Sequence, residues 1–290
     1  MINYNPKDWF GLIFKFHKSD TFRQLFWVIL SVSIYSLLIV YVELDVMQMN
    51  FTSTVMHSLL GFIISLLLVF RTNTAYDRWW EGRKKWGALV NVSRNFSLKV
   101  LTSIPDVKDR NQLLKWTRLY PFILKEHLRN AHYDLLDKEI IELIPKESIN
   151  ADHLPNSIAL KIQMLVEAST NGNFNSSNKL ALLEDLNRFT DICGACERIK
   201  KTPIPYTYNI FIKKFIFVYT ITMPIGFAGA FEYWTILITG FTFYILASLE
   251  LIAESIEDPF GLDSDDLPTD DMAVNIAKNI KELEKLKSIE

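Results

Sequence analysis

The chain has 290 residues, 49% of them hydrophobic and 13% aromatic, with a formal net charge of −2 at pH 7. A charge this close to balance provides no basic surface for a nucleic acid, so we expect no RNA or DNA partner. The 2 cysteines are too few for a disulfide framework, which excludes the class of small disulfide-stapled domains.

The amino-terminal segment, residues 1–24, precedes the first long apolar run. That run begins at Leu25 and is not followed by a small-residue cleavage site, so we expect it to be retained rather than removed as a signal peptide. Ahead of it, residues 9–16 (WFGLIFKF) combine aromatic side chains with a lysine, which is typical of a helix at a membrane interface. An amphipathic helix packed against the protein's own body explains the segment equally well.

Long apolar runs occur at residues 25–42, 51–70, 215–231 and 233–253. The first contains no acidic or basic residue and, at ~1.5 Å of rise per residue, nearly crosses a hydrocarbon core of roughly 30 Å. A buried helical hairpin in a soluble protein is the alternative, but soluble cores seldom need four runs of this length. We therefore expect an all-α integral membrane protein with four transmembrane helices.

Lysine and arginine, which favour the cytoplasmic flanks of membrane spans, predict the orientation. Lys15, Lys18 and Arg23 precede the first span, whereas the loop at residues 43–50 has no basic residue. Basic residues return after the second span, at residues 71–85, and again before the third. Both termini are therefore expected on the cytoplasmic side.

The predicted organisation has five parts. In chain order they are an N-terminal interfacial or cytosolic segment (1–24), transmembrane helices 1 and 2 (25–70), a helical cytosolic portion (71–205), transmembrane helices 3 and 4 (206–256) and a cytosolic C-terminal tail (257–290).

Helical periodicity is evident inside the cytosolic portion and in the tail. Residues 112–143 and 158–168 carry apolar side chains three and four positions apart, with charges between them. A polar loop is expected at 169–178, and the prolines of 202–205 should end one helix before the third span begins. The tail should end in an amphipathic helix whose apolar face carries Met272, Ile276, Ile280 and Leu283.

Three motifs resemble the signatures of the bestrophin family, and they occur in the family's order. They are FRTNTAYDRWWEGRKKWGALVNVSRN at residues 70–95, CERIKKTPIP at 196–205 and ESIEDPFG at 254–261. The resemblance is strongest to prokaryotic members and extends over nearly the whole chain. It implies a homopentamer around a central pore, a multi-pass protein of the bacterial inner membrane, and passive conduction of monovalent ions, chloride in the animal members.

The resemblance also implies pore residues. Counting back from Arg78 places the family's hydrophobic neck at Phe62, Leu66 and Phe70, whose spacing of four keeps them on one helix face. A ring of large apolar side chains can gate ions by dewetting. A second, cytosolic constriction falls on Ser177 by counting back from Cys193, but its hydrophobic character favours Leu180.

Charged residues flank the second and fourth spans. Glu250, Glu254 and Glu257 lie four and three residues apart at the end of the fourth apolar run. Because charges near a membrane core are costly unless paired, we expect these carboxylates to pair with Arg71 or Arg78 and to hold the two spans together. An ion-binding ring is the alternative role.

Two further patterns suggest metal or redox chemistry. Asp263, Asp265, Asp266, Asp270 and Asp271 form an acidic cluster in the region where animal bestrophins bind calcium. Apolar residues and a proline interrupt it, so we expect a solvated loop and no calcium requirement. Cys193 and Cys196 have the spacing of a redox or zinc pair, but no second pair completes a zinc site and no thioredoxin-like pattern surrounds them.

The sequence therefore predicts a pore-forming subunit rather than an enzyme, with no cofactor and no resident metal, and with membrane lipid, permeant ions and copies of itself as partners. Ion selectivity stays open, because an acidic outer loop with Glu43, Asp45 and Glu232 would concentrate cations. A cation channel of the same fold, a non-conducting membrane scaffold and a redox protein using the two cysteines are the alternatives.

Overall fold

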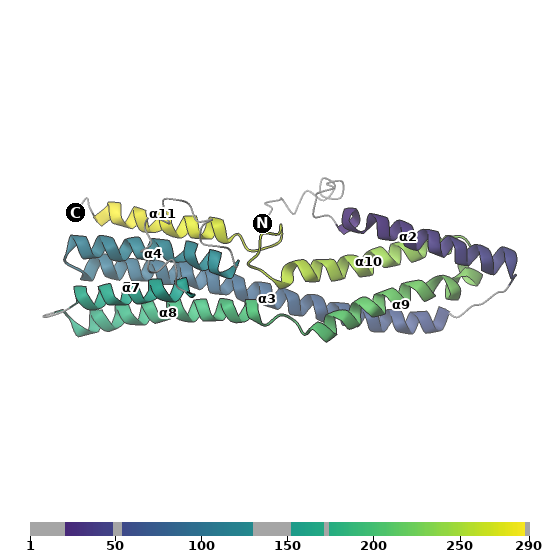
Figure 1. Cartoon of the computed structure of the whole chain (residues 1–290), viewed down its shortest axis with the longest axis horizontal. Coiled ribbons are helices and arrows are strands. Elements are labelled where there is room, and N and C mark those ends of the chain that lie inside the picture. Colours follow the sequence, from purple (N-terminus) through teal and green to yellow (C-terminus); the bar gives the residue numbers. More distant parts are fainter. Residues whose placement is uncertain (1–20, 49–53, 130–151, 171–173, 288–290) are drawn as a thin grey trace. The chain divides into compact units, whose positions relative to one another are not determined.

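A computed structural model describes residues 21–48, 54–129, 152–170 and 174–287. Within these ranges the regular elements are all helices: α2 (Thr21–Tyr41), the short π-helix η1 (Val42–Val46), α3 (Thr54–Ser103), α4 (Val107–Leu128), α7 (Leu154–Ser169), α8 (Ser176–Lys201), α9 (Tyr206–Phe231), α10 (Trp234–Glu257) and α11 (Thr269–Lys287) (Figure 1). The helix expected within residues 1–24 lies largely outside the described residues.

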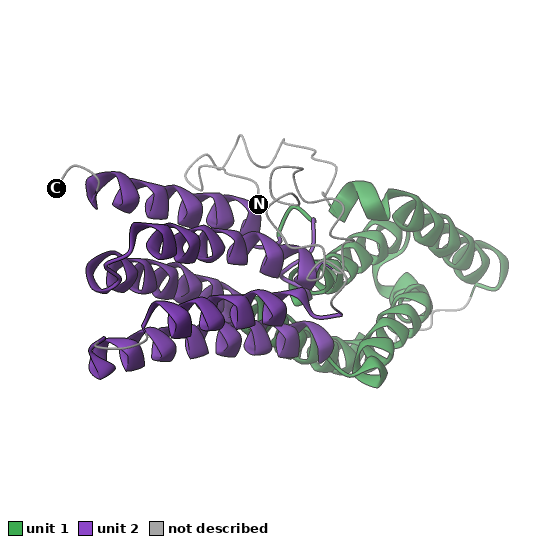
Figure 2. Ribbon diagram, turned by 60° about the vertical axis from the view of Figure 1, so that its left-hand side comes forward, with its two compact units in different colours: residues 1–79, 203–257, 263–265 green, residues 80–202, 258–262, 266–290 purple. Residues whose placement is uncertain are grey.

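The chain divides into two compact units (Figure 2). Unit 1 comprises residues 1–79, 203–257 and 263–265, and unit 2 comprises residues 80–202, 258–262 and 266–290. α3 contributes to both units, because this single helix of 50 residues continues from the second apolar run into the charged segment that follows it.

Unit 1 contains the membrane-spanning helices. Four helical segments are long and apolar enough to cross a membrane: Thr21–Val46, Thr54–Ser103, Tyr206–Phe231 and Trp234–Glu257. Each corresponds to one of the four predicted apolar runs over nearly all of its described residues, since residues 51–53 lie outside the described part of the chain, so the expected spans are confirmed. α9 begins at Tyr206, ahead of its apolar run at 215–231, because the aromatic and polar residues just before that run are also helical.

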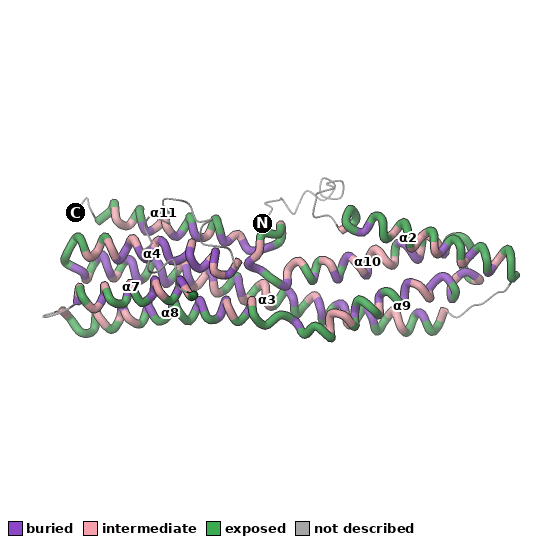
Figure 3. The backbone as a smooth tube through the Cα atoms, viewed as in Figure 1, coloured by how far each residue is buried: buried purple, intermediate pink, exposed green. Residues whose placement is uncertain are grey.

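The core of unit 1 joins α3 to α9 and α10. Its buried residues are Ile64, Leu68, Ile212, Ile216, Tyr219, Met223 and Leu246. α2 packs on α10 at Gly240, where a Cβ atom would lie 3.0 Å from the Ser33 hydroxyl. Exposed residues recur along the outer sides of α2, α9 and α10, and many of them are large and apolar (Figure 3). A surface of this kind requires lipid or other protein to cover it.

Unit 2 is a helical bundle made from the second part of α3 with α4, α7, α8 and α11. Its largest fully buried side chains include Trp86, Tyr120, Phe96 and Phe189. The helix expected at residues 112–143 is described as far as Leu128, and the rest of that range lies outside the described residues. α8 ends at Lys201 and α9 begins at Tyr206, which confirms that the proline-containing segment separates two helices.

The tail forms the expected amphipathic helix. In α11, Ile276 and Ile280 are buried, while Met272 and Leu283 at the margins of the same face are partly buried. Glu284 pairs with Arg118 of α4, which ties the carboxyl end of α11 to the bundle. The predicted apolar face is thus the face that packs.

A buried carboxylate provides a test of the packing in unit 2. The Asp185 side chain is 3% exposed and lies 2.8 Å from the Lys99 ammonium, which joins α8 to α3. Replacing Lys99 with methionine should lower the free energy of unfolding by about 3 kcal/mol, because it leaves a buried charge without its partner. Thermal unfolding followed by tryptophan fluorescence in detergent measures the change.

The exposed pair of Arg188 with Glu184 on α8 is the matched control. Arg188→Met should change the unfolding free energy by no more than about 0.5 kcal/mol. The double variant Lys99→Met with Asp185→Leu should recover much of the loss. Equal effects of the two single variants would contradict the assignment of Asp185 as a buried charge.

Candidate functional site

α3 has two distinct faces within unit 1. His57, Ile64, Leu68, Arg71 and Ala75 are buried, at spacings of three, four and seven residues that place them on one side of the helix. His57 lies 3.2 Å from the hydroxyl of Thr222 on α9, so this face also contains polar contacts. The buried face attaches α3 to the rest of the unit.

The predicted neck residues lie on the other face. Phe62 is 70% exposed, Leu66 47% and Phe70 56%. Their spacing of four sets them about one helical turn, or about 5.4 Å, apart along the helix axis. The structure thus brings the three side chains into one apolar row that the described residues leave about half exposed or more. One helix cannot enclose a pore, so this row can line a channel only where several copies meet.

Arg71 is the centre of a buried charge cluster on the packed face of α3. The residue is 1% exposed, and its Nη2 donates to the Oε2 of Glu257 at 2.7 Å. Its Nε lies 3.5 Å from the Oε2 of Glu250, which is about two helical turns before Glu257 on α10. Two carboxylates on one helix face therefore flank a guanidinium from another helix.

Glu257 makes further contacts that its sequence pattern did not predict. Its Oε1 accepts a hydrogen bond from the Ile204 backbone N–H at 2.7 Å. Its carbonyl oxygen accepts one from the Arg78 Nε at 3.1 Å. The last residue of α10 thus holds α3 at two positions and also holds the segment that leads into α9.

Glu254 has a different partner from the one expected. It pairs with Lys213 of α9 at 3.0 Å, and both side chains are about half exposed. Helix geometry explains the difference, because at about 100° per residue Glu254 lies about 40° from Glu250 on one side and Glu257 about 20° on the other. The buried residues Leu246 and Ala253 are on the side of Glu257.

The three motifs contact one another through further polar pairs. In unit 2, Arg198 of the CERI segment binds Glu81 of the RWWEG segment at 3.1 Å. Lys200 binds Asp258 of the EDPFG segment at 3.2 Å. A Cβ atom on Gly82 would lie 3.1 Å from the Phe260 ring, so the glycine permits a close approach. Residues from all three motifs therefore contact one another within unit 2.

Leu180, the expected cytosolic constriction, lies in the second turn of α8. Its side chain is 69% exposed, and Ser177, the alternative position, is also exposed. The structure places both near the start of the helix, and each is available to a neighbouring copy.

The two cysteines are buried in α8. Cys193 is 1% exposed and Cys196 is fully buried. Burial raises the pKa of each thiol to about 12. Since the thiolate is the reactive and metal-binding form, this environment disfavours the redox hypothesis.

The acidic cluster before and within α11 is partly neutralised by bases of unit 2. Asp270 lies 2.6 Å from Arg129 and 2.7 Å from Lys125. Hydrogen bonds from these two bases lower the pKa of Asp270 to about 2. One of the five clustered aspartates therefore serves an ion-pair network that anchors the start of α11 to α4.

Removal of the Glu257 side chain should destabilise unit 1. Glu257→Ala leaves Arg71 with only the longer contact to Glu250 and leaves the Ile204 N–H without its acceptor, at a cost of about 3 kcal/mol. Glu254→Ala is the control and should cost no more than about 0.5 kcal/mol, because its pair is exposed. Thermal unfolding in detergent compares them. Equal destabilisation by both would contradict the hub role of Glu257.

The thiols should resist alkylation in the folded protein. With a pKa of about 12, the thiols of Cys193 and Cys196 stay protonated at pH 8 and become reactive only as the pH rises toward that value. Maleimide labelling, read by intact mass, should modify neither cysteine until denaturant is added. A Glu184→Cys variant supplies an exposed control thiol, and labelling of the native cysteines at the control's rate would contradict their burial.

Comparison with known proteins identifies the family. The model of the bacterial and fungal bestrophin proteins matches residues 1–282. A voltage-dependent anion channel-forming protein of Nostoc is 35% identical over 236 residues, which cover 78% of this chain and 76% of the relative. The Escherichia coli protein YneE, also named a voltage-dependent anion channel-forming protein, is 29% identical over 215 residues, covering 73% and 71%.

A solved structure has the same fold. The crystal structure of a bacterial bestrophin homolog from Klebsiella pneumoniae superposes with a TM-score of 0.81 at 23% identity, covering 89% of this chain and 97% of that chain. Together with the four candidate spans, these matches make the protein a membrane protein. The chain belongs to the bacterial and fungal bestrophin family.

Proposed function

We propose that the chain is the pore-forming subunit of an anion channel that conducts monovalent ions passively across the bacterial inner membrane. The family assignment supports a channel, and the relatives from Nostoc and Escherichia coli are named for anion channel formation. Four candidate spans provide the membrane-embedded part. The basic flanks of the spans favour a cytoplasmic location for both termini.

The observation that carries this proposal is the exposed apolar row on α3. Phe62, Leu66 and Phe70 form one face of a span whose opposite face is buried. In a homopentamer, which the family resemblance implies, this row becomes three stacked rings around an axis. Apolar rings of this kind control ion passage by dewetting. A second ring at Leu180, or at Ser177, would narrow the cytosolic part of the pathway.

Anion selectivity is favoured over cation selectivity by the relatives, which are named for anion channel formation. Glu43 is 8% exposed, and Asp45 accepts a hydrogen bond from the Tyr233 hydroxyl at 2.5 Å. Asp45 and Glu232 are both exposed, so two of the three acidic residues can still attract cations. The cation channel is the second candidate, and it makes an opposite prediction for the reversal potential.

Current measurements in planar bilayers test both the ion sign and the neck. Under a tenfold KCl gradient the wild-type current should reverse close to the chloride potential, about 59 mV from zero. The variant Phe62→Ala, Leu66→Ala, Phe70→Ala should carry a several-fold larger current, because a wider and less apolar neck dewets less readily.

Leu38→Ala on α2 is the matched control, since this leucine is also apolar and 58% exposed but lies outside the proposed neck. Its current should equal that of the wild type. Reversal at the potassium potential would favour the cation channel. Absence of current in a protein that remains folded and oligomeric would favour the membrane scaffold. Loss of current in the Cys193→Ser, Cys196→Ser variant would favour the redox hypothesis.

A further inference from the structure

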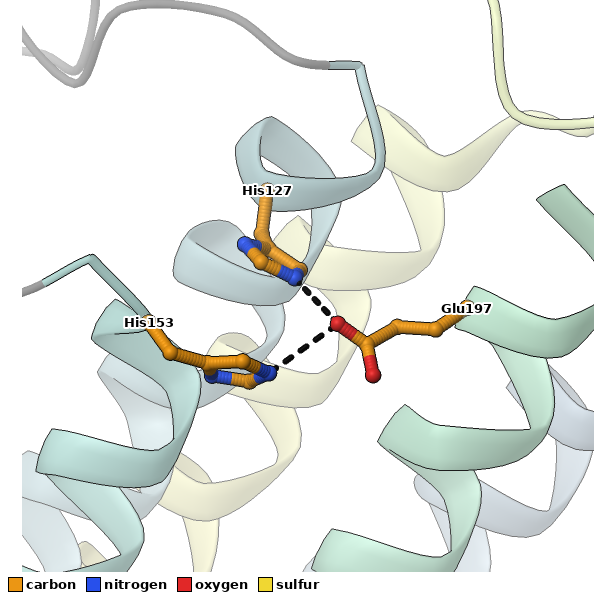
Figure 4. A group of neighbouring side chains, drawn as sticks. All are labelled: His127, His153 and Glu197. Atoms are coloured by element: carbon orange, nitrogen blue, oxygen red, sulfur yellow. Dashed lines mark hydrogen bonds and ion pairs between the residues drawn. The ribbon is translucent and has the colours of Figure 1, made fainter. Parts of the chain in front are cut away.

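Two histidines and a glutamate converge from three helices of unit 2 (Figure 4). His127 is in the last turn of α4, His153 is the N-cap of α7, and Glu197 is in α8. The Oε1 of Glu197 lies 2.6 Å from the Nε2 of His127 and 3.0 Å from the Nε2 of His153. The three ligating atoms all lie within 4.8 Å of one another.

We propose that His127, His153 and Glu197 form a binding site for a zinc-class divalent cation. Two imidazole nitrogens and one carboxylate oxygen are a ligand set that zinc uses when it keeps a fourth position for water. Cobalt and nickel accept the same ligands. Calcium and magnesium prefer sites made wholly of oxygen, so this site should select against them.

To accept the ion, the Glu197 carboxylate must move away from the two imidazoles, whose ligating nitrogens lie within 4.8 Å of each other. Tetrahedral zinc with bonds of about 2.05 Å places neighbouring ligand atoms about 3.3 Å apart. The two contacts of Glu197 are shorter than this, at 2.6 and 3.0 Å, so its carboxylate must withdraw by less than about 1 Å. The side chain of His153 is 31% exposed, which gives a metal ion access from solution.

Glu197 supplies a carboxylate charge at the site. Burial alone would raise the pKa of Glu197, but the hydrogen bond from His127 and the nearby positive charges outweigh it, and the pKa is lowered. Lys201 competes for the carboxylate at 3.6 Å, and its side chain is 71% exposed. The Lys201 side chain can swing out into solvent when a metal ion binds the Glu197 carboxylate in its place.

The same three side chains also form a hydrogen-bond cluster without any metal. The Nδ1 of His153 accepts a hydrogen bond from the Asn156 backbone N–H, which in the neutral ring leaves the proton on Nε2, facing Glu197. When a metal ion binds Nε2 of His153, that proton moves to Nδ1, and Nδ1 can no longer accept the hydrogen bond from the Asn156 N–H. The loss of this capping hydrogen bond should weaken metal binding by about fivefold.

A metal ion here would crosslink α4, α7 and α8. In sequence, His127 and His153 stand on either side of residues 130–151, so the ion would join the end of one helix to the start of the next described helix. Because the ion binds the folded arrangement and not the separated helices, it should raise the unfolding temperature of the protein.

The experiment uses the purified full-length chain in detergent, stripped of metal with a chelator and titrated with zinc chloride by calorimetry. Cobalt chloride, followed by visible absorption, reports coordination geometry, and calcium chloride is the negative probe. Each of three variants removes one ligand and keeps one hydrogen-bonding group: His127→Gln, His153→Asn, whose side chain still caps α7 but no longer reaches Glu197, and Glu197→Gln. Glu184→Gln removes an exposed carboxylate from the same helix and is the control.

Wild type and Glu184→Gln should bind one zinc ion per chain and gain thermal stability from it, and cobalt should give a tetrahedral spectrum. Each ligand variant should bind zinc at least roughly 100-fold more weakly and should keep its metal-free unfolding temperature. Failure of the wild type to bind zinc, binding of equal affinity in the ligand variants, or equal binding of calcium would each overturn the proposal. None of these results depends on the ion selectivity of the channel.

Discussion

The architecture of unit 1 depends on how the Arg71 charge is buried. A guanidinium that is 1% exposed at the end of an apolar helical stretch is tolerated only with carboxylates around it. Glu250 and Glu257 provide them from one face of α10, and Glu257 also binds the backbone of Ile204. One charge cluster thereby determines where α3, α10 and the approach to α9 meet.

This cluster also fixes the rotation of α3 about its own axis. At about 100° per residue, the centre of the row formed by Phe62, Leu66 and Phe70 lies roughly 170° from the buried side that includes Arg71. Any rotation that buried the apolar row would expose the arginine and separate it from Glu257. The polar contacts therefore orient the proposed pore residues without touching them, because helix periodicity links the two faces.

The sequence predicts the helices but not the side-chain contacts between them. Hydropathy located the four spans, since burial in lipid leaves long apolar runs, and prolines marked the break before α9. Hydropathy alone does not mark the start of α9 at Tyr206, because a helix that extends beyond the hydrocarbon region need not be apolar, whereas the prolines at 202–205 do mark it. The choice of Glu257 over Glu254 as the partner of Arg71 depended on a rotation of tens of degrees, finer than spacing alone resolves.

The histidine and glutamate cluster was beyond sequence reasoning for a different reason. His127, His153 and Glu197 belong to separate helices, and no short spacing connects them. Their proximity results from the packing of α4, α7 and α8, and the sequence predicts helices in these regions without predicting that they are neighbours. The same limit applies to the pair of Lys99 with Asp185, whose members are far apart in the chain.

The residues that follow the apolar row on α3 distinguish a pore from a lipid-facing surface. Asn73 and Asp77 are exposed and, at about 100° per residue, fall within the same narrow stripe as Phe62, Leu66 and Phe70. A lipid-facing stripe usually ends in long basic side chains that reach the headgroups, whereas asparagine and aspartate are too short to do so. Water or another copy of the chain satisfies these groups better than lipid does. The face that carries the apolar row is therefore suited to an axis where several copies surround water.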